Sequence, residues 1–303
     1  MNFNFGEVLT RAGQITWKYK VLWISGIVIA LLGLLSVPIS LLFNDPMSWM
    51  TADPAEINRR MVPILLTNGL VLLLSIVSIP VYIIGMSVPS LATRRVENGE
   101  GGLSFVDLTR DSLAYFWRVL GLFLLVYVGM FVFMMAFMAC LAVLSVATMG
   151  FGFLCAFPLF FLFIPIAILV FSLMEIGMSA VIVDNLGVMD ALRRAWELVK
   201  KNLGAMALLS ILIYLVSMVV GMVISVPMMI PMFGFISNMG AEPDLESFGR
   251  IFRNMSLWML AFSPIYAVLQ GILLTFMQST WTLTYMRLTK PQGTPQPATE
   301  ANA

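Results

Sequence analysis

The sequence predicts an all-α fold, a polytopic membrane helical bundle of about six transmembrane helices, and three observations support this class. Of the 303 residues, 60% are apolar and 11% are charged, whereas a typical soluble domain has roughly 25% charged residues. Long stretches contain no charged residue at all, and basic residues gather between alternate stretches. The net charge of +1 gives no electrostatic footprint for nucleic acid, so we expect no nucleic-acid partner.

Five stretches without Asp, Glu, Lys or Arg are long enough to cross a bilayer, which takes about 20 apolar residues. They are residues 21–44, 61–93, 119–174, 202–241 and 254–286. The third is long enough for two spans, with a turn expected at Gly150 and Gly152. In the fourth we expect one span from about Leu203 with an end broken by Pro227 and Pro231. A re-entrant segment or a seventh span at these prolines is the alternative.

The distribution of basic residues predicts the orientation of the six spans, because cytoplasmic loops are enriched in Lys and Arg. Thirteen of the 17 basic residues fall on one side: Arg11, Lys18, Lys20, Arg94, Arg95, Arg110, Arg118, Arg193, Arg194, Lys200, Lys201, Arg287 and Lys290. The other side has Arg59, Arg60, Arg250 and Arg253. We therefore expect a cell (cytoplasmic) membrane protein with both termini in the cytoplasm. Residues 1–290 form the membrane domain, and 291–303 form a disordered cytoplasmic tail.

A short amphipathic segment precedes the first, third and fifth spans, at residues 4–18, 104–118 and 187–201. The three segments align without gaps, and each begins with a candidate N-cap followed three positions later by a carboxylate, as in a capping box. These pairs are Asn4 and Glu7, Ser104 and Asp107, and Gly187 and Asp190. We interpret the chain as three repeats of an interfacial helix plus a two-span hairpin, at about 4–95, 104–185 and 187–290.

The third amphipathic segment is the one best suited to the membrane surface. Its candidate contacts with anionic lipid headgroups are Arg193, Arg194, Trp196, Lys200 and Lys201. A helix with an apolar face, an interfacial Trp and several basic residues can lie among lipid headgroups. The alternative, which is compatible with the first, is that the helix caps the bundle through its apolar face.

The same region carries a family resemblance. Ala-Leu-Arg-Arg-Ala-Trp-Glu-Leu-Val-Lys, residues 191–200, resembles the Ala-Leu-x-Arg-Ser/Ala-Trp-x-Leu-x-Lys signature of a broad group of prokaryotic multi-pass proteins. That group includes the membrane domain associated with glycerophosphoryl diester phosphodiesterases and related uncharacterised proteins. The resemblance implies a membrane fold. It does not imply the phosphodiesterase activity, which belongs to a separate soluble domain with catalytic histidines.

Residues for chemistry are scarce in this sequence. It contains no histidine, which removes the commonest general base and metal ligand. No phosphate-binding Gly-x-x-x-x-Gly-Lys-Ser/Thr run is present, and we expect the two cysteines, Cys140 and Cys155, to pack as small hydrophobes. We therefore expect no catalytic residue, no metal, no cofactor and no enzymatic activity.

Glu175 and Gln278 are the candidate intramembrane polar residues. Two places are open for the Glu175 carboxylate. It can sit at headgroup level near Arg94 or Arg95, or it can make a buried polar contact across the bundle, with Gln278 as its partner in the third repeat. Ionisable groups within spans usually face the interior and mark a functional site.

Two functions remain compatible with the sequence. The first is a multi-pass membrane protein that organises lipids or membrane protein partners at the cytoplasmic face, in contact with the bilayer and with anionic lipids. The second is a permease or exporter of an apolar or amphipathic small molecule. A polar pathway within the bundle would favour the second.

Overall fold

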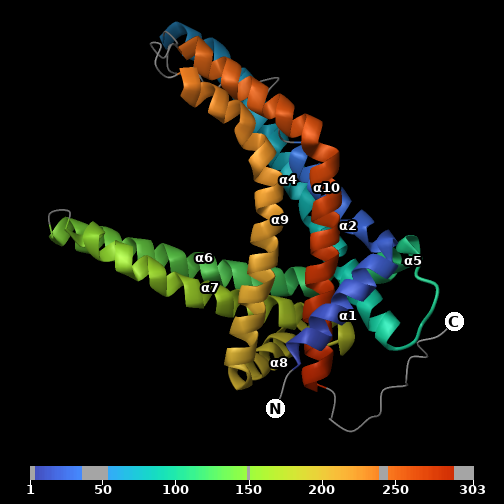
Figure 1. Ribbon diagram of the computed structural model, residues 1–303. Coiled ribbons are helices and arrows are strands. Elements are labelled where there is room, and N and C mark those ends of the chain that lie inside the picture. Colours follow the sequence, from blue (N-terminus) through green and yellow to red (C-terminus); the bar gives the residue numbers. More distant parts are fainter. Residues whose placement is uncertain (1–3, 36–53, 149–150, 239–244, 290–303) are drawn as a thin grey trace.

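The computed structural model describes residues 4–35, 54–148, 151–238 and 245–289, and its regular elements there are all helical (Figure 1). The α-helices are α1 (Phe5–Lys18), α2 (Trp23–Leu34), α4 (Pro54–Glu97), α5 (Phe105–Ser112), α6 (Phe116–Ala147), α7 (Gly152–Val183), α8 (Val188–Lys201), α9 (Leu203–Asn238) and α10 (Leu245–Thr289). Single 3₁₀ turns at Lys20–Leu22 and Leu113–Tyr115 link α1 to α2 and α5 to α6.

Five of the described helical segments are long and apolar enough to cross a membrane. They are Met61–Glu97, Phe105–Ala147, Phe163–Val183, Leu203–Val223 and Ser256–Thr289. A sixth candidate is the pair Phe5–Lys18 and Lys20–Leu34, which is bent by 85° at its break. The protein is therefore an all-helical, multi-pass membrane protein, and the predicted number of spans agrees with the upper count.

The predicted span boundaries are met in part. The long charge-free stretch at 119–174 divides into α6 and α7 as predicted, although residues 149 and 150 of the expected turn lie outside the described residues. The first predicted span, 21–44, is described only up to Leu35, and the tail at 291–303 is outside the described part. The proline-broken end expected at Pro227 and Pro231 is wrong, because α9 continues as one helix to Asn238. Helices tolerate proline within a membrane when neighbouring groups satisfy the freed carbonyls.

The three short helices begin directly after Asn4, Ser104 and Gly187, as the sequence predicts. Their caps differ from the expected capping boxes. Only the Asn4 side chain accepts a hydrogen bond from a backbone N–H, that of Glu7, at 3.2 Å, while Ser104 makes no such bond and Gly187 has no side chain. The shared starting points do not by themselves establish a threefold repeat, which stays a prediction.

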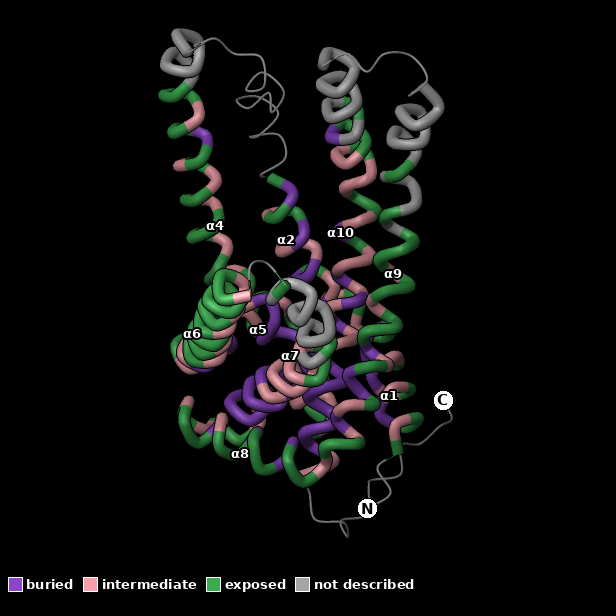
Figure 2. Tube along the Cα trace, turned by 90° about the vertical axis from the view of Figure 1, so that its left-hand side faces the viewer, coloured by how far each residue is buried: buried purple, intermediate pink, exposed green. Residues whose placement is uncertain are grey.

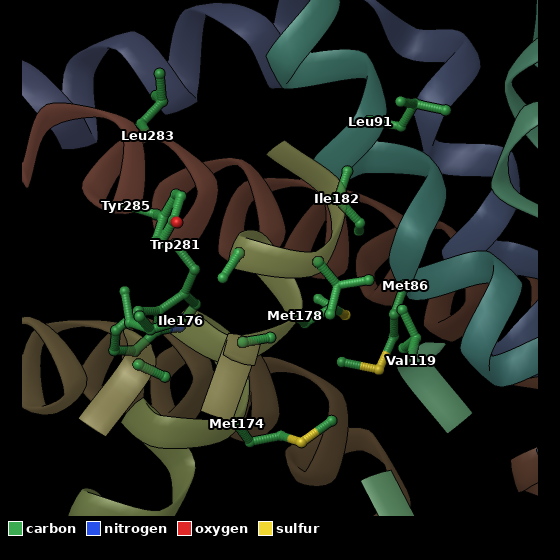
Figure 3. Packing of buried hydrophobic residues seen from close by; sticks show 14 of the residues in the cluster. Met86, Leu91, Val119, Met174, Ile176, Met178, Ile182, Trp281, Leu283 and Tyr285 are labelled. Atoms are coloured by element: carbon green, nitrogen blue, oxygen red, sulfur yellow. The ribbon is translucent and has the colours of Figure 1, made fainter. Parts of the chain in front are cut away.

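Most buried residues lie at one end of the molecule, where α1, α5 and α8 meet the ends of the long helices (Figure 2). We call this the core end. There α7 contributes Ile176, Met178 and Ile182, and α10 contributes Trp281 and Tyr285 (Figure 3). From the core end, the α6–α7 hairpin leads away at a steep angle to α9 and α10 (Figure 1).

Away from the core end, the long helices expose large apolar side chains. Leu65 and Leu72 of α4, Phe131 and Val143 of α6, and Val219 of α9 are all exposed. Leaving such side chains in water would cost roughly 1.5–3 kcal/mol each. In a bilayer they contact acyl chains, so these surfaces are the lipid-facing part of the protein.

Ion pairs join the helices at the core end. The Glu97 carboxylate, near the end of α4, accepts hydrogen bonds from Arg11 of α1 at 2.8 Å and from Arg287 of α10 at 3.2 Å. Arg95 pairs with Asp111 of α5. Because the Glu97 side chain is largely buried, its charge is stabilised by both guanidinium groups, which fixes three helices relative to one another.

Helices α2 and α10 cross through two glycines. A Cβ at Gly26 would lie 2.7 Å from the Gly271 Cα, and one at Gly271 would lie 2.5 Å from the Trp23 carbonyl oxygen. Neither distance can be accommodated by moving a flexible side chain, since the obstructing atoms are backbone. Small residues at a crossing let two membrane helices approach closely.

Candidate functional site

A buried polar cluster lies where α4, α7 and α10 meet. The Glu175 carboxylate of α7 is 2% exposed. The Gln278 side-chain amide of α10 donates to its Oε2 at 3.1 Å and to its Oε1 at 3.4 Å. The Gln278 carbonyl oxygen in turn accepts a hydrogen bond from the Ser90 hydroxyl of α4 at 3.2 Å. One chain of hydrogen bonds therefore connects three of the membrane helices.

A second hydrogen bond between α4 and α10 lies next to this cluster in the sequence of both helices. The Thr93 hydroxyl of α4 lies 3.0 Å from the Ser279 hydroxyl of α10, and both side chains are completely buried. The Thr93 hydroxyl also reaches the Pro89 carbonyl at 2.8 Å. The bond to Pro89 runs from the hydroxyl to the carbonyl one turn earlier, so the buried Thr93 side chain is satisfied within its own helix as well as across the helix contact.

The structure brings Glu175 and Gln278 together, while Arg94 and Arg95 bind other groups. Arg94 donates to the Tyr115 hydroxyl at 3.2 Å and to the Ile182 carbonyl oxygen. Arg95 is engaged by Asp111 and, at 3.6 Å, by Glu100. In the described part of the chain Glu175 forms no ion pair with either arginine, and its buried carboxylate has Gln278 as its partner. The depth of Glu175 in the bilayer stays a prediction.

Helix α8 holds the five predicted lipid-contact residues. Arg193, Arg194, Lys200 and Lys201 are all exposed, while Ala191, Ala195, Leu198 and Val199 are buried against the bundle. Trp196, expected at the interface, is 47% exposed, and Met189, seven residues before it on the same side of α8, is 66% exposed. These two residues form an exposed apolar pair on α8. Leu203 is also exposed, but it lies beyond the end of α8 as the first residue of α9.

An apolar groove of about 470 Å³ lies between α2, α4 and α6. Its lining includes Gly33 from α2, Ile79 and Tyr82 from α4, and Phe123 and Tyr127 from α6. The Tyr82 ring meets the Phe123 ring edge to face, with centroids 5.8 Å apart, and Phe123 stacks on Tyr127 at 4.5 Å. We call these three residues the aromatic cluster.

Sequence reasoning missed both the aromatic cluster and the part played by Ser90. No local pattern marks them, because each depends on which helix faces which. The only available signal was the polar content at the end of the second span, where Ser87, Ser90 and Thr93 interrupt apolar residues. All three side chains are buried.

The described residues offer little for metal binding or nucleophilic chemistry. Among them, no group of three or more His, Cys, Asp or Glu side chains is placed to hold a metal ion. Cys140 is a free, exposed cysteine near the C-terminal end of α6, and the side chain of Cys155 lies outside the described residues. What the two sites provide is a buried carboxylate with an amide partner and an apolar groove with aromatic walls.

A family described as a domain of unknown function, DUF7847, matches residues 21–288, from the start of the first predicted span to the end of α10. The chain belongs to this family. The match covers all the helices that form the Glu175 cluster, the groove and α8, so these features lie within the family domain. No curated protein and no solved structure matches the chain significantly. The DUF7847 match carries no phosphodiesterase association, and the resemblance to that membrane domain stays a prediction.

Proposed function

We propose that this multi-pass membrane protein is non-catalytic and organises anionic lipids, or partners held by them, at the cytoplasmic face of the membrane. The observation that carries the proposal is the surface of α8. Met189 and Trp196 make an exposed apolar pair on α8, and the four basic residues of the same helix are exposed as well. Apolar side chains can enter the headgroup and acyl boundary while the basic residues pair with lipid phosphates.

The packing of α8 supports the same proposal. Its buried residues already contact the bundle, so the helix is held in place without lipid. A helix that is ordered in advance loses less conformational freedom when it binds. Each basic residue near an anionic surface contributes about 1 kcal/mol at moderate salt, so four residues acting together give a clear preference for anionic lipid.

The test measures the lipids retained by the full chain after purification in a mild non-ionic detergent, by mass spectrometry. We expect the wild type to retain anionic lipids and a variant with R193Q, R194Q, K200Q and K201Q to lose most of them. The matched control neutralises Asp190 and Glu197 of the same helix, as D190N and E197Q, which should retain at least as much anionic lipid as the wild type. Equal retention by all three proteins would contradict the proposal.

A second candidate function is the export of an amphipathic small molecule. The groove between α2, α4 and α6 favours it, because an apolar site with a few polar groups is typical of small-molecule binding. The buried Glu175 carboxylate also favours it, since ionisable groups within membrane helices often belong to substrate or ion pathways. Flux of a labelled amphiphile from proteoliposomes, with protein-free liposomes as the control, tests this function.

A further inference from the structure

The aromatic cluster gives the groove a surface suited to an organic cation. Tyr82, Phe123 and Tyr127 all line the groove. The ring of Phe123 contacts the rings of both tyrosines. Tyr127 is 55% exposed, so contacts within the protein leave much of its side chain free. The faces of aromatic rings attract ammonium groups, and several rings together are the usual recognition site for quaternary ammonium ligands.

The groove offers no cationic partner to an anionic headgroup. The side chains that line it belong to Ile, Leu, Gly, Ser, Tyr and Phe residues, none of which carries a positive charge. An ammonium group would instead meet the rings of the aromatic cluster.

The remainder of the groove suits an alkyl chain. Ile29 and Leu32 of α2, Ile79 of α4 and Leu124 of α6 form apolar walls. The volume of about 470 Å³ falls within the roughly 300–1,000 Å³ of small-molecule sites. The walls belong to helices that contact acyl chains, so a ligand reaches the groove from the bilayer without crossing water.

We propose that the groove between α2, α4 and α6 binds a single-chain cationic amphiphile, with its ammonium group on the aromatic cluster and its alkyl chain along the apolar walls. The proposal rests on the second candidate function and names its substrate class. Binding does not require transport, so the two can fail separately.

The experiment uses the full chain in non-ionic maltoside micelles. Three photoreactive probes of equal chain length carry a diazirine at the same carbon and differ only in their head: trimethylammonium, hydroxyl or carboxylate. Labelled peptides are identified by mass spectrometry. The labelling by each probe is measured with and without an excess of unlabelled alkyltrimethylammonium as a competitor. We expect the ammonium probe to label the parts of α4 and α6 that line the groove, more strongly than the other two probes.

Substitutions in the aromatic cluster test the position of the ammonium group. Phe123→Leu and Tyr127→Leu each remove a ring and should weaken ammonium binding about three- to thirtyfold, the range of a cation–π contact. Tyr214→Leu, at an exposed tyrosine of α9, is the matched control and should bind as the wild type.

Filling the groove tests the position of the alkyl chain. A Cβ at Gly33 would have no neighbouring heavy atom within 4 Å, and Gly33 lines the groove, so the larger side chain of Gly33→Leu should occupy the groove and abolish labelling there. Gly129→Leu, at an equally open position of α6 that does not line the groove, should leave labelling unchanged.

Three results would overturn the proposal. They are equal labelling by the hydroxyl and ammonium probes, labelling outside the groove, and wild-type binding by a folded Phe123→Leu or Gly33→Leu protein. If the ammonium probe binds as described but no flux occurs in proteoliposomes, the binding site stands and the export function fails. Thermal unfolding of each variant in the same detergent separates loss of binding from loss of the fold.

Discussion

The Glu175 carboxylate is held inside the protein by an amide, a neutral partner. Gln278 donates to both carboxylate oxygens and its own carbonyl receives the Ser90 hydroxyl. Removing one partner from a buried hydrogen bond costs more than the bond itself contributes, because the remaining group is left unsatisfied. The identity of the side chain at position 175 should therefore affect stability through hydrogen bonding first and through charge second.

We predict that Glu175→Gln is tolerated and that Glu175→Leu destabilises the protein. Gln keeps an acceptor for the Gln278 amide, whereas Leu leaves that amide unpaired in a buried site at a cost of about 1–2 kcal/mol. Thermal unfolding of the two variants and the wild type in one detergent measures the difference. If Glu175→Gln is as unstable as Glu175→Leu, the charge itself is needed, which would favour the transport function.

The sequence led to the Glu175–Gln278 pair but not to its surroundings. The two residues occupy matching places near the ends of their spans, and that register alone suggested the contact. Ser90 and the aromatic cluster could not be found in this way. Their contacts depend on how α4 is rotated against α10 and α6, which follows from side-chain packing along whole helices rather than from spacing within one.

Among the helices, the crossing of α2 and α10 has the least room. Gly26 and Gly271 meet backbone to backbone, and α2 with α10 forms the most extensive contact between any two of the described helices. Backbone atoms cannot move aside as a flexible side chain can. An added methyl group must therefore separate the helices or shift one along the other.

We predict that Gly26→Ala and Gly271→Ala each destabilise the protein by about 1–3 kcal/mol, the cost of overpacking a closely packed site. The measurement is the thermal unfolding midpoint in one detergent. The matched controls are Gly69→Ala and Gly129→Ala, where a Cβ has no neighbour within 4 Å; they should unfold at or above the wild-type temperature. Equal behaviour of both groups would show that the helices do not cross at these glycines.

Helix ends were easier to predict than helix interruptions. The starts of α1, α5 and α8 follow candidate caps, which act within one turn and so can be recognised from a few residues. Pro227 and Pro231 misled the interpretation of α9, since proline breaks helices in water but is accommodated in membrane helices. Local sequence signals therefore predict the start of a helix better than they predict an interruption within it.

For the molecule as a whole, composition decides the class and packing decides the shape. The charge-free stretches predicted the long helices because hydrogen bonds within a helix satisfy the backbone without water. The gathering of buried residues at the core end and the divergence of the α6–α7 hairpin (Figures 1 and 2) were not predictable, since exposed apolar positions and buried ones have the same residue types in a membrane protein.

The orientation of the whole chain is the remaining prediction. Thirteen of 17 basic residues lie on the side that holds both termini in a six-span topology, which predicts cytoplasmic termini. Reporter fusions at Ala303 should be active on the cytoplasmic side, and fusions within residues 45–60 should report the opposite side. An external reporter at Ala303 would contradict this orientation. If the N-terminus is still cytoplasmic, the number of spans is odd, and the bent α1–α2 pair is the first candidate for a segment that does not cross.

The contact between α2 and α10 sets an order of events during biosynthesis. Helix α2 is synthesised well before α10, so Gly26 is in place long before Gly271 exists. Contacts between residues so distant in sequence form late and leave partly assembled chains exposed. Until α10 has been synthesised, the surface of α2 around Gly26 is without the helix that covers it in the folded protein.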